Sequence, residues 1–185
     1  MNLGKAISAL LIIATLFSCN SRHGDKLSLE KGTTATGKVI AIIDGDTYDL
    51  LIDGKEKVRI RMEGIDAPEK GMPFYKVSKK HLSDLCFEKE IQIEITGKDR
   101  YKRLLAYSYL SDGTELSHEM IRAGMAWHFK QYNTNRELSE LEKEAKAGRR
   151  GLWVDDNPMA PWTNRSLHRQ GISTKDSFDL KANQP

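Results

Sequence analysis

Three acidic residues and two arginines occur where the sequence predicts that strands end, and together they could act on a phosphate ester. The acids are Asp46, Asp66 and Glu69. Carboxylates that gather repel one another unless a cation neutralises them, and such hard oxygen ligands suit Ca²⁺ or Mg²⁺ rather than zinc. Arg61 and Arg103 carry planar guanidinium groups that match phosphate oxygens in pairs. Acids for a metal and arginines for a phosphate are what phosphodiester hydrolysis requires.

Each segment that carries these residues also has a purely structural interpretation. The Asp-Gly pair at 44–45 is typical of a turn. Asp66 comes just before Ala67-Pro68, which favours the end of a strand because proline restricts the residue that precedes it. Glu69 alone could be an exposed carboxylate, and the segment 99–103 (DRYKR) a solvated loop. Taken singly, each segment favours its structural interpretation, and only their combination indicates a site.

The tripeptide Ile-Asp-Gly occurs twice, at 43–45 and at 52–54. Asp-Gly between apolar, strand-forming runs is a strong hairpin signal. The second copy has a predicted strand on either side, so we expect Asp53-Gly54 to be a plain hairpin turn. The first copy also bends the chain, and we predict that its bend directs Asp46 towards Asp66.

The elements that must position these residues follow from the periodicity of the apolar side chains. Alternation with a period of two predicts five strands, at 36–43, 47–52, 58–62, 91–95 and 104–110. It places Arg61 on the face of its strand opposite the core. Helical spacing predicts three helices, near 74–88, 116–124 and 136–148. The order β-β-β-α-β-β-α-α predicts an α+β, mainly β fold: a five-stranded OB-fold barrel with three α-helices.

Charge and cysteine content narrow the function only a little. The formal net charge of +3 is too small to indicate nucleic-acid binding by itself. A local cluster, Lys98, Arg100 and Lys102, is more informative because it could attract a nucleic-acid backbone. Cys86 follows Leu82 at helical spacing and is expected to be a buried apolar residue.

The N-terminal segment has the features of an export signal. Residues 1–18 carry one lysine followed by an apolar run that is too short to span a bilayer. Ser18-Cys19 resembles the lipidation site of bacterial lipoproteins, so Cys19 is the expected lipid attachment site. We predict a lipoprotein signal peptide at 1–18, a flexible tether at 19–33, a folded domain at 34–165 and a polar, disordered tail at 166–185. The expected location is the cell envelope, anchored by lipid to a bacterial membrane, with a secreted soluble protein as the alternative.

Three motifs in order and separation, IIDGDT, RMEGIDAPE and DRYKR, give the chain a resemblance to the thermonuclease (staphylococcal nuclease-like) family. The resemblance continues through SDGTELSHEMIRAGMAWHF, EKEAKAGRRGLW and NPMAPWTNR, and covers about residues 37–165. It implies a monomeric, Ca²⁺-dependent nuclease of low sequence specificity that acts on DNA, with RNA as a further candidate substrate. The implied products carry 5′-hydroxyl and 3′-phosphate ends, and other divalent cations stay open as cofactors.

The resemblance also implies roles at the metal and at the phosphate. Asp46 and Asp66 would ligate Ca²⁺ together with the backbone carbonyl of Ala67. Glu69 would position or deprotonate the attacking water. The transition-state charge would be stabilised by Arg61 and Arg103.

Further residues would support these groups. The implied set that orients the ligands is Asp44 and Thr47, and the implied substrate contacts are Arg100, Lys102 and Tyr132. Ala67 stands where some members have threonine, which should matter little because the backbone is the ligand. Lys102 stands where the family usually has glycine, and a lysine there is strained if the backbone needs a positive φ.

Two other functions fit parts of the pattern. A non-catalytic OB-fold module that binds an oligonucleotide or a protein would also show the barrel, although degenerate domains of that kind normally lack the acids and arginines. A Ca²⁺-binding structural domain of the envelope would use the acids but would leave Arg61 and Arg103 unexplained.

Overall fold

The structure, a computed structural model, describes residues 29–174. The predicted signal peptide, the lipidation site Cys19, most of the tether and the end of the tail lie outside these residues. Within 29–174, no helix is long and apolar enough to cross a membrane. The ordered chain joins the domain slightly before residue 34, because the amide of Gly32 donates to the carbonyl of Ile95 at 2.8 Å.

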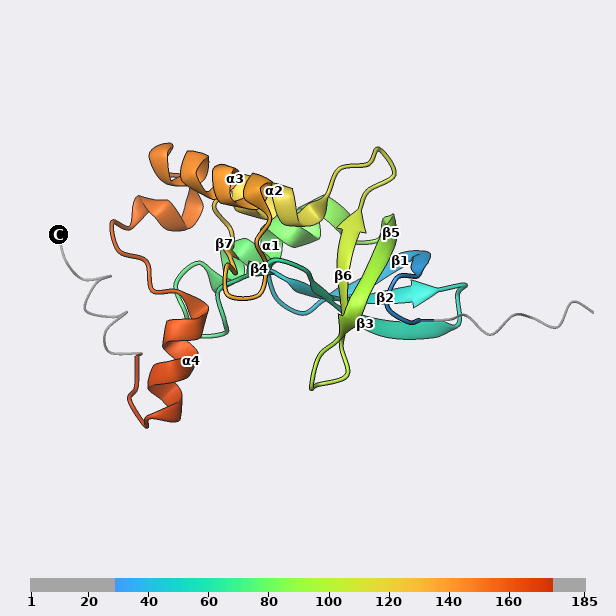
Figure 1. Ribbon diagram of the computed structural model, residues 1–185, viewed down its shortest axis with the longest axis horizontal. Helices are drawn as coiled ribbons and strands as arrows, with labels where there is room; N and C mark the ends of the chain where they lie inside the picture. The colour runs from blue at the N-terminus through green and yellow to red at the C-terminus, as the bar shows by residue number, and fades with distance from the viewer. Residues whose placement is uncertain (1–28, 175–185) are drawn as a thin grey trace, which may run out of the picture.

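All five predicted strands form, and they close into a barrel (Figure 1). The barrel strands are β1 (Thr34–Ile42), β2 (Thr47–Ile52), β3 (Glu56–Met62), β5 (Glu90–Lys98) and β6 (Leu104–Tyr109). Their order around the barrel is β1-β2-β3-β6-β5. The pairings are antiparallel except for β3 with β6. This confirms the predicted five-stranded barrel.

The barrel interior is apolar because alternate side chains of each strand point inwards. Val39, Leu50, Ile60 and Ile93 are fully buried there. Cys86 is buried against the barrel as predicted, and burial raises the pKa of its thiol to about 12. The barrel is therefore a packed core, and chemistry must take place on its outer surface and at the ends of its strands.

Three helices match the predicted ones: α1 (Tyr75–Cys86), α2 (Leu116–Arg122) and α3 (Arg136–Ala147). The prediction of only three helices is wrong, because the described chain also has α4 (Pro161–Arg169), after a short 3₁₀ helix at Gly151–Val154. The predicted domain end at 165 falls inside this helix. Pro161 makes α4 hard to predict from the sequence, because proline usually interrupts a helix. It is tolerated in the first turn, where a backbone N–H has no helical partner.

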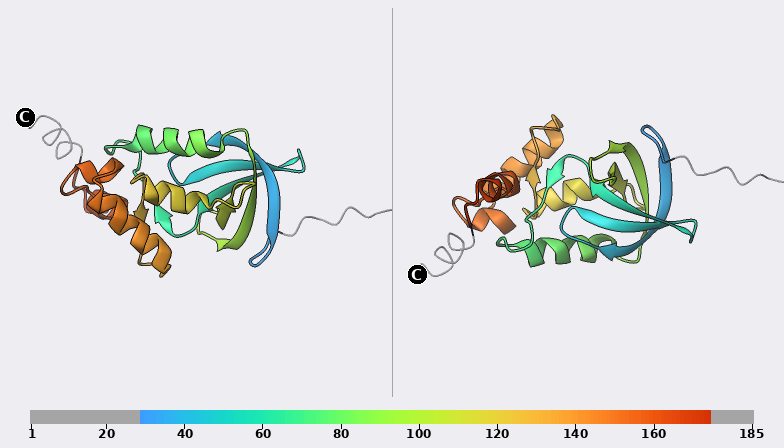
Figure 2. Two further views of the ribbon diagram at one scale, coloured as in Figure 1. Left: turned by 90° about the horizontal axis from the view of Figure 1, so that it is seen from above. Right: turned by 90° about the horizontal axis from the view of Figure 1, so that it is seen from below.

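A second, two-stranded sheet lies beside the barrel and was not predicted. It pairs β4 (Ile65–Asp66) with β7 (Trp127–His128), so that Asp66 lies opposite Trp127. Trp127 is buried and packs edge-on against Trp153 and Trp162, with ring centroids 5.7 and 6.5 Å away. These contacts make the three tryptophans packing residues. Figure 2 shows α3 and α4 gathered at one end of the molecule, with the barrel strands towards the other.

Candidate active site

The loop between β1 and β2 turns Asp46 inwards. The amides of Ile43 and Asp44 donate to the carbonyl of Thr47 at 2.9 and 3.2 Å. The carboxylate of Asp44 accepts from the amide of Asp46 at 3.1 Å, which closes a local turn. The loop leaves Asp46 only 5% exposed. Its carboxylate therefore points into the protein and not into solvent.

Asp46 is joined directly to the segment that carries Asp66. Oδ2 of Asp46 accepts from the amide of Ala67 at 2.6 Å, and Oδ1 accepts from the hydroxyl of Thr47 at 2.9 Å. Asp66 is 3% exposed. Two buried carboxylates, one from the β1–β2 loop and one from β4, are thus brought together, along with the backbone of Ala67.

Arg61 bridges these two acids. Its Nε lies 3.2 Å from Oδ1 of Asp46, and its Nη2 lies 3.0 Å from Oδ1 of Asp66. The side chain of Arg61 is only 11% exposed, whereas that of Arg59, on the same face of β3, is 47% exposed and pairs with Asp49. The alternation of side chains along β3 places the two arginines on the same face. They differ in burial and in ion-pair partners because only Arg61 lies beside Asp46 and Asp66.

Arg103, the residue before β6, reaches the same network. Its Nε donates to Oδ2 of Asp99 at 2.7 Å, and its Nη1 lies 3.4 Å from the hydroxyl of Thr47. Thr47 therefore links Arg103 to Asp46. The neighbouring Lys102 has a φ of 65°, so the lysine stands in a left-handed conformation that favours glycine.

Burial disfavours the charged forms of two acids at the site. Burial is the main cause that raises the pKa of Asp44 to about 7, and repulsion from Asp46 adds to it. The pKa of Asp66 is also raised, mainly by burial, which prevails over its hydrogen bond from Arg165. A divalent cation would relieve both effects, and the buried carboxylate and carbonyl oxygens are the donors that hard cations prefer.

The protein alone would supply few ligands. Within residues 29–174, no three His, Cys, Asp or Glu side chains converge closely enough to hold a metal by themselves. Two carboxylates, a backbone carbonyl, water and a substrate oxygen are a donor set that leaves positions open for chemistry. The residues present therefore fit a catalytic cation better than a closed structural one.

Two residues of α4 complete the acid cluster, and sequence reasoning assigned a role to neither. Arg165 donates to Oδ2 of Asp66 and to Oε1 of Glu69, both at 2.7 Å. Asn164 lies 3.3 Å from the other oxygen of Glu69. The only sequence signal was their place in the segment NPMAPWTNR, which carries part of the family resemblance.

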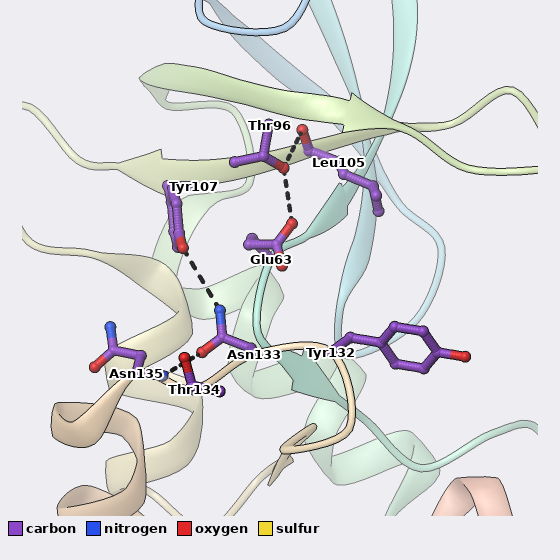
Figure 3. Close-up of a pocket in the computed structure, with 8 residues that line it drawn as sticks. All are labelled: Glu63, Thr96, Leu105, Tyr107, Tyr132, Asn133, Thr134 and Asn135. Atoms are coloured by element: carbon purple, nitrogen blue, oxygen red, sulfur yellow. Dashed lines mark hydrogen bonds between the residues drawn. The ribbon is translucent and has the colours of Figure 1, made fainter.

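The predicted substrate contacts lie on exposed segments. Tyr132 is 71% exposed, and its ring lies 4.8 Å from that of Phe129. It borders an open cavity of about 570 Å³ (Figure 3). The other lining residues are Glu63, Thr96, Leu105, Tyr107, Asn133, Thr134 and Asn135. Arg100 and Lys102 are exposed in the turn between β5 and β6.

Comparison with known proteins agrees with the resemblance seen in the sequence. Residues 59–155 match the family of staphylococcal nuclease homologues. The chain belongs to the staphylococcal nuclease family. The matched segment holds Arg61, Asp66, Glu69 and Arg103 but neither Asp46 nor α4.

Bacterial relatives are similar over most of the chain. An uncharacterized endonuclease of Haemophilus influenzae is 39% identical over 155 residues, which cover 84% of this chain and 81% of the relative. An uncharacterized endonuclease of Escherichia coli is 40% identical over 134 residues, 72% of this chain and 86% of the relative. A micrococcal nuclease of Shigella flexneri is 38% identical over 147 residues, 74% of this chain and 84% of the relative.

Proposed function

We propose that this member of the staphylococcal nuclease family is a Ca²⁺-dependent endonuclease that hydrolyses DNA, and RNA as a second substrate, with low sequence specificity. The observation that carries the proposal is one continuous polar network. It runs from Asp66 through Arg61 to Asp46, and from there through Thr47 to Arg103. Acids and arginines from the β1–β2 loop, β3, β4 and the β5–β6 turn thus meet at one place, as phosphodiester hydrolysis requires.

Asp46, Asp66 and the carbonyl of Ala67 would hold the cation. When bound, Ca²⁺ supplies a Lewis acid that polarises a phosphate oxygen. Asp44 and Thr47 fix the conformation of Asp46 through its amide and its carboxylate, so the ligand would need little reorganisation to bind.

The remaining residues act on the phosphate and the water. Arg61 and Arg103 would donate to the oxygens of the pentacoordinate phosphorus, where negative charge accumulates. Glu69 would orient or deprotonate the attacking water, because its half-exposed carboxylate lies at the edge of the buried acids. Cleavage that leaves a 3′-phosphate and a 5′-hydroxyl would follow if the 5′ oxygen is the leaving group.

Substrate would bind along the exposed aromatic and basic groups. Arg100 and Lys102 would attract the phosphate backbone, and Tyr132 would stack against a base at the cavity that it borders. Stacking is tolerant of base identity, which supports low sequence specificity.

The first test is cleavage of plasmid DNA and of RNA by the purified protein with Ca²⁺, Mg²⁺ or Mn²⁺ in turn. We expect cleavage with Ca²⁺ and none after EDTA is added; cleavage that continues in EDTA would contradict the metal mechanism. Products should accept phosphate from a polynucleotide kinase directly. They should prime a polymerase only after a phosphatase removes the 3′-phosphate.

The arginines have a matched control on the same strand. Arg61→Ala and Arg103→Ala should each lower kcat by roughly 10²–10³-fold, because each removes a donor to the transition state. Arg59→Ala should leave turnover unchanged, because Arg59 pairs with Asp49 outside the network. Equal rates for Arg59→Ala and Arg61→Ala would remove Arg61 from the mechanism.

A non-catalytic binding module is the competing function. It predicts that the protein retards labelled DNA in Ca²⁺ and leaves it uncut. The presence of all the acids and both arginines in one network disfavours it, and the cleavage assay separates the two.

We also propose that the protein is exported and anchored by lipid at Cys19. The support is the sequence of residues 1–19 alone. Growth with a radioactive fatty acid should label the wild-type protein and a Cys86→Ala control, but not Cys19→Ala. Label that persists on Cys19→Ala, or none on the wild type, would contradict the anchor and favour a secreted soluble protein.

A further inference from the structure

The helix α4 lies outside the segment that matches the nuclease family, yet it contacts the acid cluster. The matched segment ends at residue 155, and α4 begins at Pro161. Arg165 makes ion pairs with Asp66 and Glu69, at 2.7 Å each. These contacts span 96 and 99 positions of the sequence.

Both oxygens of the Glu69 carboxylate are held from α4. Oε1 accepts from Nη1 of Arg165 at 2.7 Å, and Oε2 lies 3.3 Å from Nδ2 of Asn164. The Glu69 side chain is 36% exposed, so its rotamer is not fixed by burial. The two donors of α4 supply that constraint instead.

The helix itself is firmly placed. The ring of Trp162 stacks on that of Phe129, with centroids 5.4 Å apart and planes 9° apart. Asn164 is 3% exposed and accepts a hydrogen bond from the hydroxyl of Thr174. Packing on one side and a buried hydrogen bond on the other fix which residues of α4 face the acids.

Arg165 and Arg61 divide the acids between them. Arg61 pairs with Asp46 and Asp66, whereas the ion pairs of Arg165 are to Asp66 and Glu69. Arg165 contacts both oxygens of the Asp66 carboxylate, at 2.7 and 3.3 Å, and so joins Glu69 to Asp66. This arrangement suits a group that holds Glu69 in place beside the metal ligands.

We propose that Arg165, assisted by Asn164, is a positioning residue of the nuclease site. It fixes the Glu69 carboxylate next to Asp66, so the working site includes α4 as well as the family-matched segment. The inference rests on the proposed function, since it assigns Arg165 to the same reaction. Removal of an outer partner of this kind typically costs roughly 10–100-fold in activity.

The kinetic test compares Arg165→Ala with Arg169→Ala, which removes the same charge from an exposed position of α4. With saturating Ca²⁺ and a defined oligonucleotide, Arg165→Ala should lower kcat roughly 10–100-fold and leave KM unchanged. Arg169→Ala should behave as the wild type. Arg165→Lys should recover only part of the rate, because an ammonium group cannot bridge two carboxylates as a guanidinium does.

A second variant tests the helix. Trp162→Ala removes the stack that places α4, and should lower kcat as Arg165→Ala does. The double variant should lose no more than either single one, because residues that act as a unit are not additive. Additive losses would overturn the proposed link between Trp162 packing and Arg165.

A readout without turnover uses thermal unfolding in EDTA and in Ca²⁺. Arg165→Ala removes a cation from Asp66 and Glu69, so Ca²⁺ should raise the Tm of this variant by more than it raises that of the wild type or Arg169→Ala. A purely structural role would lower Tm equally in both conditions and would overturn the inference.

The outcomes separate this inference from the proposed function. A wild type that cuts neither DNA nor RNA would contradict the proposed function. The Ca²⁺-induced change in Tm would still test the role of Arg165 in that case. An active wild type with an equally active Arg165→Ala defeats the inference alone. Three results for Arg165→Ala would also overturn it: a raised KM alone, faster cleavage than the wild type at low Ca²⁺, or a loss of the Ca²⁺-induced rise in Tm.

Discussion

The two Ile-Asp-Gly tripeptides both connect antiparallel strands, but the structure uses them in opposite ways. In the copy at 52–54, Asp53 and Gly54 have φ values of 50° and 65°, and both are exposed. A Cβ on Gly54 would meet nothing within 4 Å. This glycine is needed for backbone conformation alone, and its aspartate faces solvent.

In the copy at 43–45 the glycine is needed for space. Gly45 is buried and its φ lies outside the left-handed region, but a Cβ there would lie 1.9 Å from the hydroxyl oxygen of Ser78 and 2.9 Å from Cβ of Ala67. The β1–β2 loop becomes part of the site because α1 and the Asp66–Ala67 segment pack closely against it. The same three residues thus acquire their role from what packs on them.

The largest difference between the two copies should be in catalysis. Asp46→Asn, just after the first copy, should lower cleavage at least about 100-fold, because a metal ligand matters no less than its outer partners. Asp53→Asn removes the same charge from the exposed turn and should leave cleavage unchanged. Initial rates on one oligonucleotide in saturating Ca²⁺ measure both, and equal rates would abolish the distinction.

The next difference should be in stability. Gly45→Ala should lower the free energy of unfolding by about 2–4 kcal/mol, because the added methyl overpacks the loop and pushes Ser78 from its hydrogen bond to the Met125 carbonyl. Gly54→Ala should cost only about 1 kcal/mol, from strain at positive φ. Urea unfolding measures both.

A double variant checks the cause of the Gly45 effect. Ser78→Ala removes the oxygen that the new Cβ would meet, so Gly45→Ala with Ser78→Ala should recover part of the loss. No recovery, or equal costs at Gly45 and Gly54, would mean that space is not what distinguishes the two glycines.

The pH dependence of stability should differ at the two aspartates. The folded protein raises the pKa of Asp44 from 3.8 to about 7, so between these values it holds a proton that the unfolded chain releases. This contribution is fully present below about pH 4 and is lost as the pH rises towards 7. In EDTA, Asp44→Asn should therefore lose less stability than the wild type over this range.

The control for this pH effect is Asp53→Asn. It removes a carboxylate from an exposed turn, so its fall in Tm between pH 4 and 7 should parallel that of the wild type. A steep fall in Asp44→Asn as well would assign the pH dependence to other acids of the cluster.

The smallest effect should be that of Asp53→Asn on stability at neutral pH. Asn-Gly and Asp-Gly favour the same tight hairpin turn, and the side chain is exposed. Its unfolding free energy should stay within about 0.5 kcal/mol of the wild type. A larger change would show that the second loop has contacts beyond the turn itself.

Prediction from the sequence succeeded where the physics is local. The barrel strands follow from alternation, as in Val58–Met62, and α1 and α3 follow from apolar residues at helical spacing. The turn at Asp53-Gly54 follows from the conformational freedom of the pair. These signals depend on residues within a few positions of one another, so they predict the elements without knowledge of the tertiary structure.

Prediction failed where the physics is not local. The strands β4 and β7 have two residues each, which is too short for periodicity to show. The helix α4 begins with Pro161 and follows Pro158. Two prolines so close together are typical of a loop, so the sequence did not predict this helix. No local rule distinguishes Arg61 from Arg59, and their different partners appear only when Asp46 and Asp66 are in place.

By itself, the sequence determined the barrel, the family and the short motifs whose acids and arginines could hold a cation and a phosphate. Only the tertiary structure decided three further features. Gly45 is required because a side chain there would clash with Ser78 and Ala67. Arg61 bridges two acids, and α4 donates hydrogen bonds to Glu69. The reason is physical. Motif spacing specifies which groups are available, whereas contacts across 96 or 99 positions depend on packing, such as the stack of Trp162 on Phe129.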